Sequence, residues 1–455
     1  MFVEQTLFPV LIVILSFYYN NLYDLHIVRN FSEFAKRLPR VLGVAFVLLY
    51  GFYAFFPITR EKSDPLFFCI LLTIAVLTVI LPVRLVLYHF LKISALSERV
   101  IILGMGHIAS KIVDAIEASS HVSYTIIGLV DDRRASCQLD SQSAKYALLG
   151  SLDRLHEILD EHRPDRIVIA LTERRGFLPV RDLLDARMAG SIVEDAVDVH
   201  ERLTKKLAIE SLTPSDLFFS KDFNTSRLKM SSRHIVSLAF AFVVLFLVAP
   251  FMVLIAILIK MDSYGPVLFI QDRCGWHGRM FRLIKFRTTH PVQSGKEHER
   301  FGEQEDGSRV TRVGKWLRKL RLDEIPQFIN VLLGDMDLIG PRPELASNVK
   351  TMIKEIPYYS LRMSVRPGIT GWAQVKHGSS VSYEDVTEIM CYDLYYIKHM
   401  SLWFDLRILL DTIKVILLGW NSGKNKLSEK KETNQSLTSS LIVTLLQSVR
   451  STERR

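Results

Sequence analysis

The 455-residue sequence contains few cysteines, and they lie far apart. The four are Cys69, Cys137, Cys274 and Cys391, and no two of them form a Cys-x-x-Cys pair. This spacing argues against a disulfide framework and against a paired-cysteine metal or redox motif. We therefore expect the soluble parts of the chain to work in a reducing compartment.

Signatures of nucleic-acid binding are also missing, although the chain is basic. No zinc-finger, homeodomain or RNA-recognition pattern occurs. The formal net charge of +9 suits nucleic acid, anionic lipid or a phosphorylated substrate. Because 49% of the residues are hydrophobic, a chain that lies partly in a bilayer fits best, and we expect lipid and phosphate partners and no nucleic acid.

Long hydrophobic runs cluster at the N-terminus, at 7–19, 41–57 and 66–91. A helix needs about 20 residues to cross the hydrocarbon core, so the second and third runs are long enough and the first is marginal. No small-residue cleavage site follows the first run, which favours an anchor over a signal peptide. The basic loop 20–40 is expected on the cytoplasmic side.

An alternation of strand-like and helix-like segments follows, with strands expected at 99–104, 123–130 and 166–171 and helices at 107–118 and 152–161. This order predicts a doubly wound parallel sheet. The segment 104–109 (GMGHIA) matches a dinucleotide fingerprint with alanine at the third glycine, and Asp131 and Asp132 are candidates for the ribose-binding acid. The motif leaves two interpretations open: bound NAD, or a tight turn in a structural or regulatory module. We favour the second.

A fourth apolar stretch runs from 235 to 259 and contains Pro250 near its middle. Proline breaks the helical hydrogen-bond ladder, so a kink or a break is expected there. Basic residues flank the stretch on both sides: Lys229 and Arg233 before it, Lys260 and Arg273 after it. Basic ends favour the cytoplasmic side, so the residues fit either a re-entrant helix or an ordinary kinked span.

Two cations fall on one face of a strand expected at 281–287. Lys285 and Arg287 are two residues apart, and alternate residues of a strand point to the same side. Such a pair can grip a diphosphate. The alternative is that the two charges lie on a solvent-exposed strand edge and prevent it from pairing with another chain. When the strand is considered alone, this alternative is favoured.

An acidic pair follows a strongly basic stretch: Asp323 and Glu324 come directly after 312–321. Asp323 can cap a new helix that tolerates Pro326 in its first turn, so both acids could serve the helix alone. In the functional interpretation, the neighbouring cations keep Asp323 ionised so that it can attack phosphorus, and Glu324 holds a hard divalent cation.

Several motifs together resemble one family, the bacterial polyprenyl-phosphate sugar-1-phosphate transferases. They are L-R-x-x-x-L-D-E-x-P-Q at 317–327, N-V-L-x-G-D-M at 330–336, G-P-R-P at 340–343, G-P-V-x-F-x-Q at 265–271, K-F-R at 285–287 and R-P-G-I-T-G-W-A-Q-V at 366–375. The resemblance covers roughly 230–420, and the upstream part is similar to the large, exopolysaccharide-initiating branch.

The resemblance implies a two-step transfer from a UDP-sugar to undecaprenyl phosphate. Asp323 falls on the nucleophile of the family and Glu324 on the acid associated with Mg²⁺ (or Mn²⁺). The residues that fall on substrate-binding positions are Lys285, Arg287, Arg318, Gln327, Arg342, Arg366 and Gln374. The implied location is the bacterial inner membrane, with several spans and the catalytic domain on the cytoplasmic face. The sequence identifies neither the sugar nor the oligomeric state, and a homo-oligomer stays open.

The expected fold class is membrane α plus α/β. Its parts are N-terminal transmembrane helices (1–95), a Rossmann-like parallel-sheet module (96–225), a mostly helical catalytic domain (229–423) with a re-entrant membrane helix (235–259), and a polar tail (424–455). Residues 402–420 are expected to form a helix lying in the membrane interface.

The sequence departs from the family at three points. Thr288 and Thr289 follow K-F-R in place of Ser-Met, Asp337 follows G-D-M in place of serine, and three N-terminal spans stand where the resemblance implies four. Two rival functions remain at this level: a membrane-anchored NAD-dependent oxidoreductase or epimerase, and a non-catalytic scaffold for polysaccharide assembly.

Overall fold

In the computed structural model, the chain divides into two compact units, Met1–Lys205 and Lys206–Arg455. The described residues are 2–20, 22, 31–55, 65–92, 97–118, 124–131, 146–171, 178–209, 226–290, 310–377 and 383–418. Asp132 and the predicted polar tail (424–455) lie outside them.

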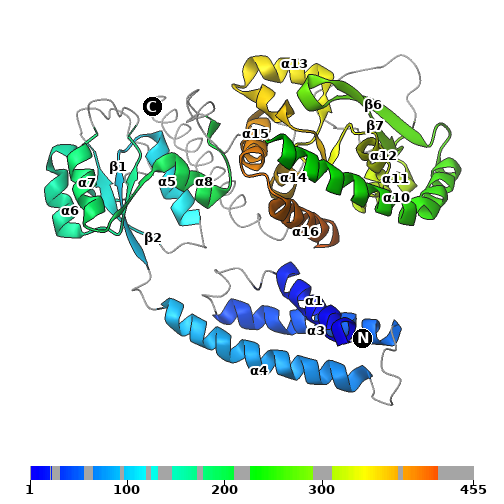
Figure 1. Cartoon of the computed structure of the whole chain (residues 1–455), viewed down its shortest axis with the longest axis horizontal. Helices are drawn as coiled ribbons and strands as arrows, with labels where there is room; N and C mark the ends of the chain where they lie inside the picture. Colours follow the sequence, from blue (N-terminus) through cyan, green and yellow to red (C-terminus); the bar gives the residue numbers. More distant parts are fainter. Residues whose placement is uncertain are drawn as a thin grey trace, which may run out of the picture. The chain divides into compact units, whose positions relative to one another are not determined.

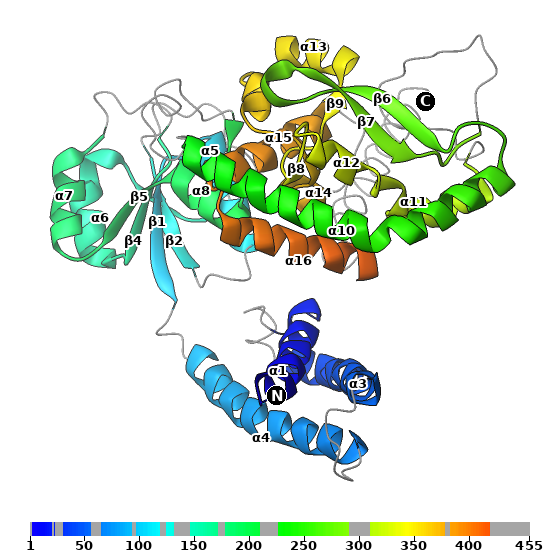
Figure 2. The same ribbon diagram turned by 45° about the vertical axis from the view of Figure 1, so that its right-hand side comes forward.

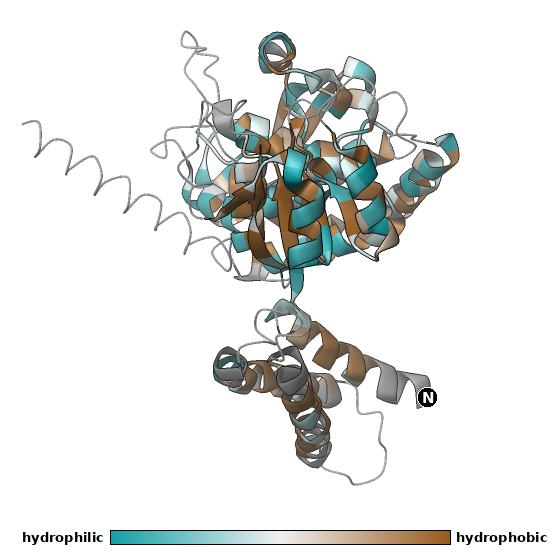
Figure 3. Cartoon of the chain, turned by 90° about the vertical axis from the view of Figure 1, so that its left-hand side faces the viewer, coloured by the Kyte–Doolittle hydropathy of each residue, from teal (hydrophilic) through white to brown (hydrophobic). Residues whose placement is uncertain are grey.

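The first unit begins with helices α1 (Phe2–Tyr19), α3 (Phe31–Phe55) and α4 (Pro65–Lys92). The runs at 7–19 and 66–91 and residues 41–55 of the second run lie in these helices, which Figure 3 shows as largely hydrophobic. Their shared core includes Phe17, Phe34 and Val41. Within the described residues, their apolar stretches are shorter than a bilayer span. The helices are therefore confirmed, and their crossing of a membrane stays a prediction.

A five-stranded parallel sheet with order β3-β2-β1-β4-β5 follows (Figure 1). Its strands are β1 (Glu98–Leu103), β2 (Tyr124–Val130), β3 (Leu148–Gly150), β4 (Arg166–Ile169) and β5 (Ile192–Asp195). In β1, Val100 and Ile102 pack on the side of α5 (His107–Ala118) and α8 (Ala196–Thr204). Ile101 and Leu103 pack on the side of α6 (Leu155–His162) and α7 (Val180–Met188). Both faces are covered, so β1 is apolar throughout its buried length, and the predicted doubly wound sheet is confirmed.

The second unit begins with one long helix, α10 (Arg227–Asp262). It is the one helix among the described residues that is long and apolar enough to cross a membrane. The helix continues through Pro250, and Figure 2 shows it as two arms joined at a bend. Proline has no N–H to donate and crowds the preceding turn, which bends a helix without unwinding it. This bend suits either a kinked span or a re-entrant path.

The rest of the unit packs short elements against α10. A hairpin of β6 (Leu268–Cys274) and β7 (Met280–Phe286) pairs with β9 (Glu344–Leu345), and β8 (Asp337–Ile339) pairs with β10 (Gly368–Thr370). The helices are α11 (Arg312–Lys319), α12 (Gln327–Leu332), α13 (Ala346–Glu355), α14 (Trp372–Lys376), α15 (Tyr383–Lys398) and α16 (Leu402–Leu418), with 3-10 turns at Leu322–Glu324 (η8) and Tyr359–Ser364 (η9). The main core gathers around Tyr359, Trp372 and Tyr396.

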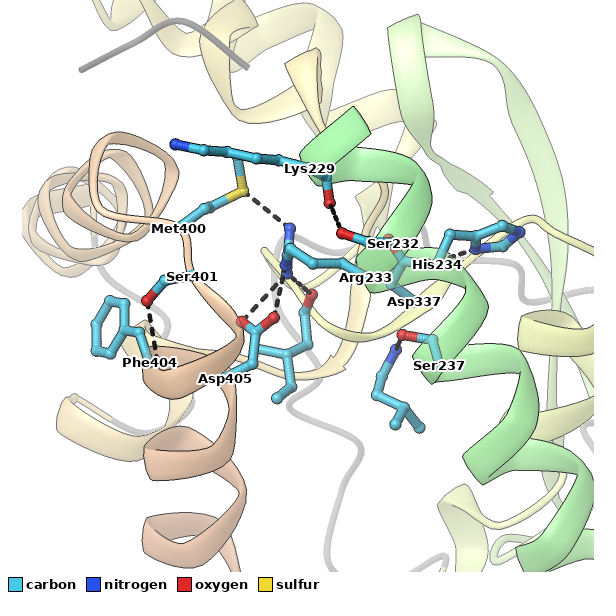
Figure 4. A network of polar contacts seen from close by, with 12 residues as sticks. Lys229, Ser232, Arg233, His234, Ser237, Asp337, Met400, Ser401, Phe404 and Asp405 are labelled. Atoms are coloured by element: carbon cyan, nitrogen blue, oxygen red, sulfur yellow. Dashed lines mark hydrogen bonds and ion pairs between the residues drawn. The ribbon is translucent and has the colours of Figure 1, made fainter. Parts of the chain in front are cut away.

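A buried arginine fastens the start of α10 to this core (Figure 4). The guanidinium of Arg233 donates to Asp405 on α16, with Nε 2.5 Å from Oδ2, and to the backbone oxygen of Ile339, 3.2 Å away. Tyr396 donates to the same Ile339 oxygen. One turn further along α10, Ser237 accepts a hydrogen bond from the backbone of Leu338. The helix is thereby held to both α16 and β8.

Candidate functional site

The two acids lie on a short turn that the backbone of Arg321 makes possible. Arg321 is left-handed, with φ of 56°, which ends α11 and starts the 3-10 turn η8. Helix α12 then begins after Pro326 without any side-chain cap. The expectation that Asp323 caps this helix is therefore wrong, because the turn places the acid before the helix start.

Asp323 is largely buried, and its oxygen Oδ1 has no hydrogen-bond partner within the described structure. The pKa of Asp323 is raised to about 6, mainly by burial and also by the adjacent Glu324, while Lys285 and Arg321 oppose the shift. A buried carboxyl oxygen without a donor is costly and uncommon. Such a group is a candidate for chemistry with a ligand.

Glu324 is held by two arginines at the same oxygen. Nη1 of Arg321 and Nη1 of Arg342 each lie 3.3 Å from Oε1 of Glu324. The Glu324 side chain is 14% exposed, that of Arg342 23% and that of Arg321 51%. Two guanidinium groups therefore hold one oxygen of this carboxylate. The turn places the arginine-bound Glu324 next to an Asp323 whose pKa is raised to about 6.

The loop that carries Arg342 is fixed through its backbone carbonyls. Buried arginines donate to three of these oxygens: Arg233 to Ile339 at 3.2 Å, Arg362 to Arg342 at 3.1 Å, and Arg273 to Pro343 at 3.1 Å. Sequence reasoning missed Arg233, Arg273 and Arg362 as supports, because cations in apolar surroundings give no sign of which carbonyl they meet. These hydrogen bonds hold in place the loop from which Arg342 contacts Glu324.

The strand β7 brings one of its two predicted cations to the acids. Lys285 is near enough to Asp323 to lower the pKa of that carboxyl. Arg287 lies just past the end of the strand and donates to the carbonyls of Ser263 and Tyr264, each at 2.8 Å. Arg287 therefore satisfies backbone oxygens after the last turn of α10, which normally lack partners, and its guanidinium is committed there.

The other predicted residues are spread around the turn. Arg318 donates to the hydroxyl of Thr288 at 2.9 Å. Thr288, which departs from the family motif, therefore has a hydrogen-bond partner. Arg366 donates to the backbone of Gly334 at 3.3 Å. Gln327 is buried at the start of α12, and Gln374 has a buried Oε1 without a partner within the described residues. No described hydrogen bond or ion pair joins Gln327, Arg366 or Gln374 to the acids.

The second departure, Asp337, also has a partner in the structure. His234 Nδ1 on α10 lies 2.6 Å from Asp337 Oδ1 (Figure 4). Through this contact, Asp337 connects β8 to α10.

Asp323 and Glu324 supply two carboxylates that could hold a metal ion. Within the described residues, no group of three or more His, Cys, Asp and Glu side chains is placed to hold an ion. Mg²⁺ is usually bound by one or two carboxylates together with substrate phosphates. The unpartnered Oδ1 of Asp323 beside the carboxylate of Glu324 fits that pattern.

The glycine-rich turn of the first unit has a structural explanation. Gly104 has φ of +109°, and a Cβ there would lie 2.8 Å from the Ala170 oxygen, so the close approach of two strands requires glycine. Asp131, the candidate ribose acid, accepts the backbone N–H of Met105 at 3.0 Å. Both observations favour a structural turn over a dinucleotide site.

The comparisons with known proteins converge on the second unit. The family model described as bacterial sugar transferase matches residues 228–419. The chain is 49% identical over 176 residues to the UDP-N-acetylgalactosamine-undecaprenyl-phosphate N-acetylgalactosaminephosphotransferase of Aeromonas hydrophila, covering 39% of this chain and 41% of that one.

Two further relatives extend the match. The chain is 32% identical over 327 residues to the undecaprenyl-phosphate glucose phosphotransferase of Komagataeibacter xylinus, covering 70% of this chain and 59% of that one. It is 37% identical over 160 residues to the uncharacterized sugar transferase EpsL of Bacillus subtilis, covering 35% of this chain and 74% of that one. The match thus spans less than two thirds of the first two relatives and most of the third.

Proposed function

The chain belongs to the bacterial sugar transferase family, and from that premise we propose that it transfers a sugar 1-phosphate from a UDP-sugar to undecaprenyl phosphate and releases UMP. The relatives from Aeromonas hydrophila and Komagataeibacter xylinus, whose names give undecaprenyl-phosphate sugar phosphotransferase activities, support this reaction. The observation that carries the proposal is the buried, unpartnered carboxyl oxygen of Asp323 beside the arginine-bound Glu324.

In the first step, Asp323 attacks the phosphorus that bears the sugar. A bond forms between the carboxylate oxygen and phosphorus, the bond between phosphorus and the UMP oxygen breaks, and UMP leaves. In the second step, a phosphate oxygen of the lipid attacks the same phosphorus, and the bond to Asp323 breaks. Splitting the transfer this way replaces one difficult step with two easier ones. Lys285 and Arg342 offset the negative charge that gathers around the reacting phosphorus.

Glu324, with Asp323, would hold Mg²⁺ or Mn²⁺. A bound ion would supply positive charge that offsets the charge of the diphosphate in the donor and of the UMP that leaves. Glu324 is oriented for this by Arg342. Removal of divalent ions with EDTA is expected to stop transfer, and full turnover in the chelator would exclude this role.

The reaction needs a water-soluble donor and a membrane-bound acceptor to meet. We place the second unit at the cytoplasmic face of the bacterial inner membrane, with α10 re-entering at its bend and the N-terminal helices spanning the bilayer. The apolar length of α10 and the basic residues at both its ends support this arrangement. Polysaccharide initiation is the process this lipid-linked product would serve.

The deciding experiment is exchange of labelled UMP into a UDP-sugar without lipid acceptor. Asp323→Asn keeps the shape of the side chain but has no nucleophilic carboxylate, so exchange and transfer are both expected to be lost. Glu324→Gln is expected to slow both reactions and to raise the metal concentration they need. Normal exchange by Asp323→Asn would overturn the assignment of the nucleophile.

A further inference from the structure

Strand β7 has a second edge that no strand covers. In the sheet order β7-β6-β9 it pairs with β6 on one side, and no other strand in the described part of the chain pairs with its opposite edge. Helix α12 and the acidic turn η8 both contact β7. Backbone N–H and C=O groups buried at such an edge need hydrogen-bond partners, so a side chain has to supply them.

The partner is Asn330 of α12, whose side chain is fully buried. Its Nδ2 donates to the backbone oxygen of Arg282 at 2.8 Å, and its Oδ1 accepts the backbone N–H of Ile284 at 3.0 Å. A side-chain amide offers a donor and an acceptor as a peptide group does. Asn330 therefore bonds to the edge of β7 as a neighbouring strand would.

The amide of Asn330 fits in one orientation. Nδ2 also lies 3.4 Å from Oδ2 of Asp335, so the amino group meets two acceptors while the oxygen meets one donor. A flipped amide would set like groups against each other at all three contacts. An aspartate would place a carboxylate oxygen against the Arg282 oxygen and the Asp335 carboxylate. The position therefore requires an amide.

These two bonds fix the register between β7 and α12. The core between the two elements is apolar, with Leu283 of β7 and Val331 of α12 both buried in it. Apolar contacts are not directional and resist sliding weakly, whereas hydrogen bonds require particular distances and angles. Asn330 therefore determines where β7 lies along α12.

The register matters for the acidic pair because of Lys285. Lys285 follows Ile284 directly in β7, and α12 begins at Gln327, shortly after the turn that holds the acids. Lys285 is close enough to lower the pKa of Asp323. Asn330 thus connects the strand that carries this cation with the helix that follows the acids.

We propose that Asn330 is a positioning residue for the transfer, holding Lys285 beside Asp323 so that the ammonium group offsets charge on the reacting phosphorus. This inference rests on the proposed function. No described hydrogen bond joins Asn330 to either acid, so its effect on the reaction passes through Lys285. The alternative is that Asn330 stabilises the fold and does nothing more.

The test is a double-mutant cycle on UMP exchange by the full chain in detergent, with Asn330→Ala, Lys285→Gln and both changes together. A displacement of about 1 Å can cost about 100-fold in rate, so Asn330→Ala is expected to lower the maximal exchange rate about 10- to 100-fold. The half-saturating UDP-sugar concentration should change little, because Lys285 acts on charge that develops in the transition state. In the Lys285→Gln background, Asn330→Ala should lower the rate by less than about twofold. An equal loss with and without Lys285 would overturn the proposal.

Thr412→Val is the matched control for stability. Thr412 of α16 shares a hydrogen bond with Thr370 of β10 at 2.8 Å, and valine keeps the shape while removing the bond. Thermal unfolding should show a loss of stability in this variant and in Asn330→Ala, whereas the exchange rate should fall in Asn330→Ala alone. Equal falls in rate would show that the rate follows stability, and would overturn the proposal.

Asn330→Ser, which keeps a polar group too short to reach both backbone partners, repeats the cycle if Asn330→Ala does not fold. Deuterium exchange adds a measurement on the wild type: the Ile284 amide should exchange slowly, and exchange as fast as that of an unbonded amide would overturn the proposal. The proposed function is read separately. Exchange of UMP by the wild type with independent losses in the cycle removes the role of Asn330 and keeps the function, whereas no exchange by the wild type removes the function itself.

Discussion

Arg342 reaches across from its loop to place Nη1 3.3 Å from Oε1 of Glu324. The same oxygen receives Arg321, which is half-exposed, whereas the loop of Arg342 is fixed by buried arginines. The backbone of Arg342 is therefore held in place, whereas the half-exposed side chain of Arg321 can change rotamer. Arg342 is preorganised for a phosphate, because little reorganisation is needed when substrate binds.

Arg342→Lys is expected to lower kcat/KM about 10- to 100-fold. Lysine keeps the charge but lacks the planar fork, so it cannot hold Glu324 and a phosphate together. Steady-state transfer from a UDP-sugar measures the effect. Arg282→Lys, at an exposed position of β7, is the matched control; equal losses in both variants would remove the special role of Arg342.

The pH dependence of the exchange reaction should follow Asp323. Burial raises its pKa to about 6, and only the ionised carboxylate can attack phosphorus. The rate is therefore expected to fall about tenfold per pH unit below that value and to level off above it. Lys285 lowers the pKa of Asp323, so Lys285→Gln should move the midpoint to higher pH. A midpoint that stays in place would show that Lys285 does not face the acid.

The same pKa makes a prediction about stability. The folded-state pKa of Asp323 is raised to about 6, above an unfolded value of about 3.9, so ionisation of Asp323 destabilises the folded protein at high pH. Asp323→Asn should therefore stabilise the chain by about 1–2 kcal/mol near neutral pH and above, allowing for partial solvent screening. The gain should disappear as pH falls through about 6 toward about 4. Thermal unfolding at several pH values measures it; destabilisation at high pH would mean that the carboxylate has unseen partners.

Periodicity and motifs predicted the elements that depend on local sequence. The alternation of strands and helices at 99–171 predicted the parallel sheet. The basic stretch before Asp323 predicted that the acidic pair is a candidate site. Local sequence did not reveal that Arg321 adopts a left-handed conformation, because that residue type rarely does so. Because of this backbone conformation, Asp323 lies in a 3-10 turn before α12 and does not cap the helix, and its buried Oδ1 has no partner among the described residues.

The sequence could not predict which side chains contact residues far away in the chain. Lys285 and Arg287 look equivalent in a strand, but the strand ends between them, and Arg287 meets carbonyls 23 and 24 residues away. Which charges meet is decided by tertiary packing.

The ion pair between Arg233 and Asp405 should be the main anchor of α10. Both side chains are buried, with Nε 2.5 Å from Oδ2. Asp405→Asn leaves a buried guanidinium without its counter-charge, which typically costs about 3–5 kcal/mol. Asp411→Asn on the same helix is the control, because its ion pair with the exposed Arg407 is 4.0 Å long, and removing such a pair is expected to cost at most about 1 kcal/mol. Thermal unfolding in detergent compares them, and equal losses would contradict the anchor.

The path of α10 can be read from single-cysteine labels at its two ends. Ser232 is an exposed site before the apolar part. After it, Ser263 is unsuitable because its Oγ accepts a hydrogen bond from Arg287, whereas the neighbouring Tyr264 is 96% exposed.

In a background without the four native cysteines, Ser232→Cys and Tyr264→Cys should both react with a membrane-impermeant maleimide from the cytoplasmic side only. The reason is electrostatic: Lys229 and Arg233 lie before the apolar arm and Lys260 near its end, and cations next to a short membrane segment stay in the cytoplasm. Inverted and right-side-out vesicles give the two sides. Labelling of the two sites from opposite sides would establish a true span, and would place the Asp323 turn across the membrane from the first residues of its own domain.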